Sequence, residues 1–258
     1  MGVVYGSNIR RVEKLLLQVA DALLREESRP RAESFDHGVL VILRGINLNP
    51  GSEVEDMISV RLWLTKNRVV STGRRRLRSL EVIQADIEAG NGPKSSGEFL
   101  VLLVRKLGDF MSDTIEDIES SLEQVEERVQ VTRTIASNSP FSLLRRQVAR
   151  IQRYLGPQRE ALDRLSRIRN ELFSEDDQIN LREETNRLSI LLENLELARE
   201  RAIVAQEEFL SILAHEQNER MLLLSIIAAI FLPLSFLTGL MGMNVAGLPG
   251  TENHLAFW

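Results

Sequence analysis

The stretch from Met221 to Met241 reads MLLLSIIAAIFLPLSFLTGLM, twenty-one residues without one charged side chain. A helix rises about 1.5 Å per residue, so this stretch would form a helix about 30 Å long. That length matches the hydrocarbon core of a bilayer. The stretch therefore predicts a membrane-spanning helix.

The residues on either side of this span predict its orientation. Arg199, Arg201 and Arg220 precede it, whereas residues 244–258 contain no Lys or Arg. Because basic residues are retained on the cytoplasmic side, we expect the long N-terminal part in the cytoplasm. The N-terminus lacks a basic segment followed by an apolar one, so we identify no cleavable signal peptide. The span is expected to act as its own insertion signal.

Composition alone would place this chain among soluble proteins. It has 258 residues, 27% of them charged, a net charge of -5 and a mean hydropathy of -0.10, because a single span is averaged away. After the span, Glu252 is the only Asp, Glu, Lys or Arg. The chain has no cysteine. This excludes disulfides, thiolate metal sites and cysteine nucleophiles.

The N-terminal third predicts an α+β domain with a small, mostly antiparallel sheet. Apolar residues at helical spacing predict a helix over 7–27, which ends at Arg29-Pro30 because the residue before a proline avoids the helical region. Runs rich in β-branched residues at 39–43 and 58–64 predict a hairpin. Residues 67–72 predict a third short strand.

A basic run, Arg-Arg-Arg-Leu-Arg, follows at residues 74–78. With no aromatic residue between the arginines, and in an acidic protein, it favours a solvated loop over a nucleic-acid or lipid-headgroup patch. We therefore expect no nucleic-acid partner.

From Leu80 onward the sequence predicts helices. A short helix over 80–89 precedes a long one over 97–134 with an acidic second half, and the next helix carries eight arginines from Arg145 to Arg169. We expect these two long helices to form an antiparallel hairpin whose opposite charges neutralise each other on wet faces. The acidic helix also has an apolar stripe, formed by Leu100, Leu103, Leu107, Met111, Ile115, Ile118, Leu122, Val125 and Val129.

The last helix is predicted to be very long. Ser174 to Asp177 has the capping-box pattern that opens a helix. Because no glycine or proline follows until Pro233, we expect one helix from about Asp176 to Met241, roughly 100 Å long. Apolar residues spaced three and four apart, as in a coiled coil, indicate either packing onto the preceding hairpin or a bundle of several such helices. They are Leu188, Leu191, Leu195, Ala198, Ala202, Ala205, Phe209 and Ile212.

The span continues the same spacing with small and polar residues. Such a stripe is the face that packs against neighbours or lines a pore in a bundle of membrane helices. Pro233 removes one backbone hydrogen bond and leaves a carbonyl free for another partner. The stripe consists of Asn218, Met221, Ser225, Ala228, Leu232, Ser235 and Gly239.

The residues at both ends of the span carry a resemblance to a known family. The span runs into Gly242-Met243-Asn244 and then the Gly/Pro-rich turn at 245–250. With Asn218–Met221 before it and Phe231–Gly239 within it, this segment resembles the signature of the CorA/ZntB family of divalent metal-ion transporters. The resemblance covers nearly the whole chain.

The resemblance implies roles for the residues of the span. The stripe becomes a pore wall, with Met221, Leu224 and Leu232 as apolar constrictions that gate by dewetting and Ser235 as a polar position. Gly242, Met243 and Asn244 become the selectivity filter, where a ring of Asn244 amides and Gly242 carbonyls holds a hydrated divalent cation. Gly242 is expected to lie in a turn that uses the conformational freedom of glycine.

The loop after the tripeptide predicts the ion. Residues 245–250 are less acidic and less aromatic than the loop of the magnesium branch and resemble the ZntB zinc branch, as does Glu27–Arg31. We therefore expect zinc as the transported ion, with magnesium, cobalt or nickel as the alternative, and no resident cofactor. His37 and His215 are isolated and expected to be structural or at the surface. Glu252 and His254 are candidate cation ligands at the outer mouth, but a solvated loop explains them equally well.

The family architecture implies partners, location and domains. We expect a homopentamer in contact with membrane lipid and divalent cations, in the bacterial plasma (inner) membrane. The full-length form would be multi-pass, so we expect this chain to correspond to the family architecture without the second transmembrane helix and part of the N-terminal domain. The acidic helix could then sense intracellular divalent cations, although charge neutralisation is favoured. The expected divisions are 1–96 (α/β subdomain), 97–173 (helical hairpin), 174–220 (stalk helix), 221–241 (transmembrane helix) and 242–258 (extracellular or periplasmic loop).

Two other classes of protein are alternatives for this sequence. A single-pass membrane-anchored coiled-coil protein without transport activity explains the span and the heptads but not Gly242-Met243-Asn244. A soluble α/β enzyme is poorly supported, because the sequence contains no phosphate loop, nucleophile motif or metal-ligand pair. We therefore expect no enzymatic activity.

Overall fold

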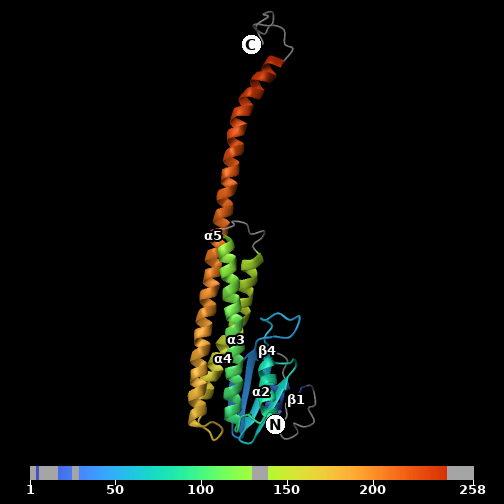
Figure 1. Cartoon of the computed structure of the whole chain (residues 1–258), viewed down its shortest axis with the longest axis vertical. Helices are drawn as coiled ribbons and strands as arrows, with labels where there is room; N and C mark the ends of the chain where they lie inside the picture. The colour runs from blue at the N-terminus through green and yellow to red at the C-terminus, as the bar shows by residue number, and fades with distance from the viewer. Residues whose placement is uncertain (1–3, 6–16, 25–28, 130–138, 243–258) are drawn as a thin grey trace, which may run out of the picture. The chain divides into compact units, whose positions relative to one another are not determined.

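A computed structural model describes residues 4–5, 17–24, 29–129 and 139–242 (Figure 1). Along the chain a small α/β part comes first and three long helices follow. The described residues up to Gln206 form one compact unit, and those from Glu207 onward form a second.

The sheet has five strands in the order β1-β5-β4-β3-β2. β1 pairs in parallel with β5, and the other neighbours pair antiparallel. The predicted strands at 39–43, 58–64 and 67–72 are confirmed by β3, β4 and β5, and the sheet is mostly antiparallel as expected. The short strands β1 and β2 were not predicted. The bounds are β1 Val4–Tyr5, β2 Arg31–Phe35, β3 Gly38–Gly45, β4 Ile58–Thr65 and β5 Arg68–Gly73.

Helices cover both faces of this sheet, which is why β3 is buried along almost its whole length. On one face, α1 (Leu17–Leu24) packs Val19 and Leu23 against Leu40 and Trp63. The rest of the helix predicted over 7–27 lies outside the described residues. On the opposite face, Gly45 lies against α3, where an added Cβ would come 2.6 Å from Leu107. Only glycine allows this close approach.

The predicted helices at 80–89 and from 97 onward are confirmed by α2 (Arg78–Glu88) and α3 (Ser96–Glu127). Ser95 caps α3, its hydroxyl accepting a hydrogen bond from the Glu98 N–H at 3.0 Å. All nine positions of the predicted apolar stripe, from Leu100 to Val129, are buried. The end of the helix predicted to 134 lies outside the described residues. The basic helix is α4 (Ser139–Arg167).

The last helix, α5, runs from Glu175 to Gly242 without a break and contains Pro233, as predicted. Its predicted capping box is confirmed: the Ser174 N–H donates to Asp177 Oδ2 at 2.9 Å, and the Asp177 N–H donates to Ser174 Oγ at 3.1 Å. The apolar stripe from Leu188 to Phe209 is buried within the single chain, and Ile212 is half-buried. Within the unit that ends at Gln206, packing onto the chain's own helices thus accounts for the heptads, so this part of the pattern is no evidence for a bundle of several chains.

Candidate functional site

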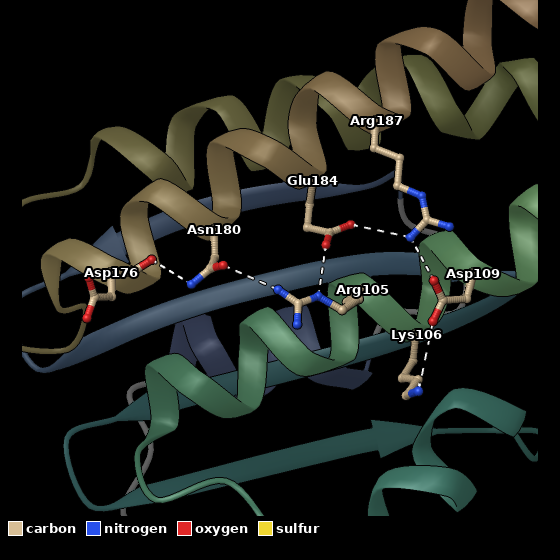
Figure 2. Close-up of polar contacts among 7 residues, drawn as sticks. All are labelled: Arg105, Lys106, Asp109, Asp176, Asn180, Glu184 and Arg187. Atoms are coloured by element: carbon tan, nitrogen blue, oxygen red, sulfur yellow. Dashed lines mark hydrogen bonds and ion pairs between the residues drawn. The ribbon is translucent and has the colours of Figure 1, made fainter.

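The first part of α5, residues 175–206, is attached to α3 by a polar network (Figure 2). Arg105 of α3 donates from Nε to Glu184 at 3.2 Å and from Nη2 to the side-chain oxygen of Asn180 at 3.2 Å. One turn further along α3, Asp109 accepts from Arg187 Nη1 at 2.7 Å. We call these five residues the α3–α5 network.

The network follows from helical spacing. Arg105 and Asp109 lie four residues apart on α3 and alternate in charge, while Asn180, Glu184 and Arg187 lie four and three apart on α5, so each set presents one face. Arg187 also lies 3.9 Å from Glu184 and so connects the two ion pairs. Only 9% of the Glu184 side chain is exposed. The arginines therefore stabilise a carboxylate that would be costly to bury alone.

This network was not predicted, although one feature of the sequence indicated that Glu184 needs a partner. Glu184 lies three residues after Leu181 and four before Leu188, both buried, so it occupies a position of the apolar stripe. A carboxylate at such a position requires a cationic or hydrogen-bonding partner. The signal identifies Glu184 but not Arg105, which lies on another helix.

A third ion pair joins α3 and α5 farther along both helices. Arg201 contacts Glu126 through two parallel bonds, Nε to Oε1 at 3.2 Å and Nη2 to Oε2 at 2.6 Å. The hydrogen bond to Glu126 raises the pKa of Arg201, with smaller contributions from the charges of Glu126, Glu123 and Glu119, while burial opposes the shift. The acidic half of α3 therefore faces an arginine of α5 here.

This arrangement corrects the expected charge pairing of the hairpin. We expected the acidic helix and the basic α4 to neutralise each other, but the ion pairs described here connect α3 to α5. Arginines of α4 instead reach the loop before β4: Arg150 lies 3.0 Å from Asp56 and 3.8 Å from Glu55. Total charge predicted that these helices need partners, but not which faces meet.

The start of α5 also fits closely against the start of α3. Gly97, in the first turn of α3, is buried. A Cβ there would lie 2.8 Å from the Leu172 carbonyl oxygen and would contact the Asp177 carboxylate of the capping box. The missing side chain of Gly97 therefore lets the two helix starts touch.

The second part of α5, residues 207–242, has a different environment. Among the described residues, α5 is the one helix long and apolar enough to cross a membrane, with an eighteen-residue window of mean hydropathy 2.4 and no part of it buried. The Ser225 hydroxyl donates to the Met221 carbonyl of its own helix at 2.9 Å, and the Thr238 hydroxyl donates to the Ser235 carbonyl at 3.1 Å. All eight predicted pore-lining residues are exposed: Asn218, Met221, Leu224, Ser225, Ala228, Leu232, Ser235 and Gly239.

The end of α5 corrects one expectation. Gly242 was expected in a turn needing glycine freedom, but it is the last residue of the helix, and among described glycines only Gly51 and Gly90 have positive φ. A Cβ at Gly242 would meet none of the other described residues within 4 Å. The remaining predicted filter and mouth residues, Met243, Asn244, Glu252 and His254, lie outside the described residues.

The described histidines lie on the surface, as expected. His37 is exposed in the turn between β2 and β3, and exposed His215 lies 3.4 Å from Glu219 on its own helix. In the described part of the chain, no group of three or more His, Asp or Glu side chains could hold a metal ion.

Comparison with known proteins places these features in a family. The sequence profile of the CorA-like Mg2+ transporter protein family matches residues 9–258. The "Divalent cation transporter CmaX" of Pseudomonas aeruginosa is 42% identical over 240 residues, covering 92% of this chain and 72% of the relative. The "Zinc transport protein ZntB" of Yersinia enterocolitica is 34% identical over 239 residues, covering 93% and 73%.

A solved structure agrees with this result. The structure of the full-length CmaX protein superimposes with a TM-score of 0.85 at 39% identity, covering 97% of this chain and 78% of that one. The named relatives are transporters, in line with the expectation of a non-enzymatic protein. The chain belongs to the CorA-like family, the CorA/ZntB family of divalent cation transporters.

Proposed function

We propose that this protein conducts a divalent cation, zinc in the first place, across the bacterial inner membrane through a pore lined by the second part of α5. The observation that carries the proposal is the segment 221–241, which is uncharged, helical and uncovered by the other described residues, and which runs into Gly242-Met243-Asn244. An anchor needs only the apolar length. The polar stripe and the tripeptide are additional features that a pore uses.

The stripe supports a homo-oligomer, for which we propose a pentamer. None of the other described residues covers residues 221–241, so lipid and further copies of the same helix would cover them. Small residues such as Ala228 and Gly239 permit close approach of neighbouring helices. Asn218, Met221, Leu224, Ser225, Leu232 and Ser235 would then face the pore.

The chemistry of the filter follows from its ligands. A ring of Asn244 amides supplies neutral oxygens, which suit a hard divalent cation that keeps part of its water shell. Met221, Leu224 and Leu232 would form apolar constrictions that close by dewetting. Glu252 and His254 would act only by raising the cation concentration near the mouth.

Zinc is proposed because one group of relatives carries zinc transport in its name and because residues 245–250 resemble the zinc branch. The relative with 42% identity is named for divalent cations generally, so magnesium, cobalt and nickel are the comparison ions. Competition among these four ions in one flux assay ranks them directly. Preference for magnesium over zinc would contradict the choice of ion but not the pore.

The test of the pore is zinc uptake by proteoliposomes made with the natural gene product. Asn244→Ala removes one amide per chain from the filter and leaves the span intact. Transport should therefore fall by an order of magnitude or more, which corresponds to a barrier higher by about 1.4 kcal/mol or more, while oligomer size is retained. Glu252→Gln is the matched control, with a mild effect that fades as salt is added. Normal flux through Asn244→Ala would leave a membrane-anchored coiled-coil protein as the better description.

Gly242→Ala separates two explanations for the glycine at the helix end. Within one chain the added methyl group meets nothing, so the single-chain fold should not change. If the pore is built as proposed, the methyl groups of all copies crowd the filter and reduce flux. Unchanged flux would show that Gly242 does not lie at the narrow mouth.

A further inference from the structure

The unit that ends at Gln206 contains a cavity of about 570 Å³ whose lining is dominated by arginines. Its walls come from β3, β4, the loop before β4, the segment after β5 and α4. Two carboxylates, Glu55 and Asp56, also line it, so the described lining residues carry a net charge of +4 in a protein whose total is -5. The six arginines are Arg44, Arg61, Arg74, Arg75, Arg150 and Arg153.

Strand register explains why the cavity is basic. Arg44 of β3 lies opposite Ser59 of β4, and Arg61, two residues after Ser59, lies opposite Ile42. Because side chains two residues apart share a face, Arg44, Ser59 and Arg61 all lie on one face of the sheet. The hydroxyl oxygen of Ser59 is buried and has no hydrogen-bond partner among the described residues.

Two of the arginines are held in place by the protein. Arg44 donates from Nη1 to the Met57 carbonyl at 2.8 Å, and its guanidinium stacks over the Tyr154 ring at 4.4 Å. The guanidinium of Arg153 lies 5.6 Å from the same ring on its own helix. These contacts hold the two guanidinium groups at the wall of the cavity.

The cavity concentrates positive charge. Arg61 is only 4% exposed, and burial, followed by the charges of Arg44 and Arg74, lowers its pKa. The two carboxylates lie near arginines of α4, Asp56 at 3.0 Å from Arg150 and Glu55 at 3.8 Å from it. The chain therefore gathers like charges at one place, which an anion would stabilise.

We propose that this cavity binds a small anion with two or more linked phosphate groups, such as pyrophosphate or the phosphate chain of a nucleotide. The planar fork of arginine matches the oxygens of phosphate, and several forks around one cavity match a chain of phosphates better than a single one. An extended polyanion such as nucleic acid would meet the acidic remainder of the protein, so the ligand is small.

The proposal gives a role to part of the basic run at residues 74–78. Arg74 and Arg75 are exposed, as the solvated-loop expectation required, but both line the cavity. The site lies in the unit that ends at Gln206 and does not depend on the proposed pore. If no transport were found, the anion site would still stand. If no anion bound, the proposed pore would still stand.

The test is isothermal titration calorimetry of the full chain in detergent and in metal-free buffer, with pyrophosphate, ATP, inorganic phosphate and sulfate as the titrants. Pyrophosphate or ATP should bind saturably and about tenfold or more tighter than phosphate and sulfate, because more charge-assisted hydrogen bonds form. Equal affinity for pyrophosphate and ATP identifies the phosphate chain as the recognised group, and tighter binding of ATP assigns a nucleotide. Absence of saturable binding of both would overturn the proposal.

Variants locate the site. Both Arg74 and Arg153 are exposed, so the double variant Arg74→Gln/Arg153→Gln should fold, which its melting temperature and circular dichroism verify. Its affinity for pyrophosphate should fall about tenfold or more. Arg159→Gln is the control, because Arg159 is exposed on the same helix as Arg153 but lies outside the cavity lining. Equal affinity of the double variant and the control would place the binding elsewhere and refute the proposed site.

Discussion

Helix α5 has one pattern of side-chain spacing and two environments. In its first part, Leu195 is fully buried within the chain, whereas in its second part Leu232 is 71% exposed. The first part carries charged residues that pair with α3, and residues 221–241 carry none. Spacing of three and four thus defines one face of a helix but not what covers it. The chain itself covers the first part, and lipid and further copies are proposed to cover the second.

The largest expected effect comes from the buried stripe. Leu195→Ala leaves a cavity at a fully buried position, so the free energy of unfolding of the unit that ends at Gln206 should fall by about 3 kcal/mol. Urea unfolding in detergent measures the change. Leu197→Ala is the matched control, since Leu197 is 57% exposed in this chain and should cost at most about 0.5 kcal/mol.

The cost of Leu197→Ala shows whether anything outside this chain covers the exposed face of α5. A large cost of Leu197→Ala would mean that another copy covers this face in the assembly. Equal and small costs for both variants would contradict the packing of the first part of α5 within its own chain.

A smaller effect is expected where α5 begins. Gly97→Ala would push a methyl group against the Leu172 carbonyl and the capping box, which should cost about 1–3 kcal/mol. Gly156→Ala in α4 is the control, because a methyl group there meets nothing within 4 Å and alanine is the better helix former by about 1 kcal/mol. Thermal unfolding of both variants should shift in opposite directions. A stabilising Gly97→Ala would contradict the close contact.

The second part of α5 is tested by two neighbouring alanines. Ala228 lies on the proposed interhelical stripe and Ala229 does not, and both are exposed in the single chain. Ala228→Leu should weaken the oligomer by on the order of 1 kcal/mol per interface by preventing close approach of helices, whereas Ala229→Leu should leave it intact. Native mass measurement in mild detergent compares the two. Equal behaviour of the variants would show that this stripe does not face other copies.

The smallest expected effect concerns the ion pair between Arg201 and Glu126. Its geometry is bidentate, but 35% of the Arg201 side chain is exposed, so solvent screening limits the loss on Arg201→Gln to about 1 kcal/mol or less. Arg199→Gln removes a more exposed pair with Glu196 on the same helix and should cost less. A double-mutant cycle with Glu126→Gln isolates the coupling. No measurable coupling would reduce this contact to a surface ion pair.

Patterns with a period were predictable from the sequence. The central strands β3 and β4 have long apolar runs, and α3 and α5 have stripes with the helical repeat, so element type followed directly. The edge strand β2 was missed because only one of its five residues, Ala32, is buried. Its strand conformation comes from pairing with β3 rather than from its own composition.

Contacts between distant helices were not predictable in the same way. The sequence showed an acidic and a basic helix in succession, yet Arg105 and Asp109 of α3 pair with residues of α5 that lie more than seventy positions later. Helix rotation sets these partners, and rotation depends on how all the apolar stripes pack together. The exposure of the predicted pore stripe agrees with its proposed role, and its function stays a prediction until flux is measured.

The capped, buried start of α5 has a consequence for the order of synthesis. The unit that ends at Gln206 cannot be completed until the ribosome has made the chain as far as Ala205, the last buried stripe residue of that unit. Met221, where the uncharged span begins, is only sixteen residues later. At 5–20 residues per second, about 1–3 s separate the two. The last segment of that unit's core and the apolar span are thus synthesised almost together, and any variant that delays docking of α5 on α3 exposes the apolar stripe while the span is being made.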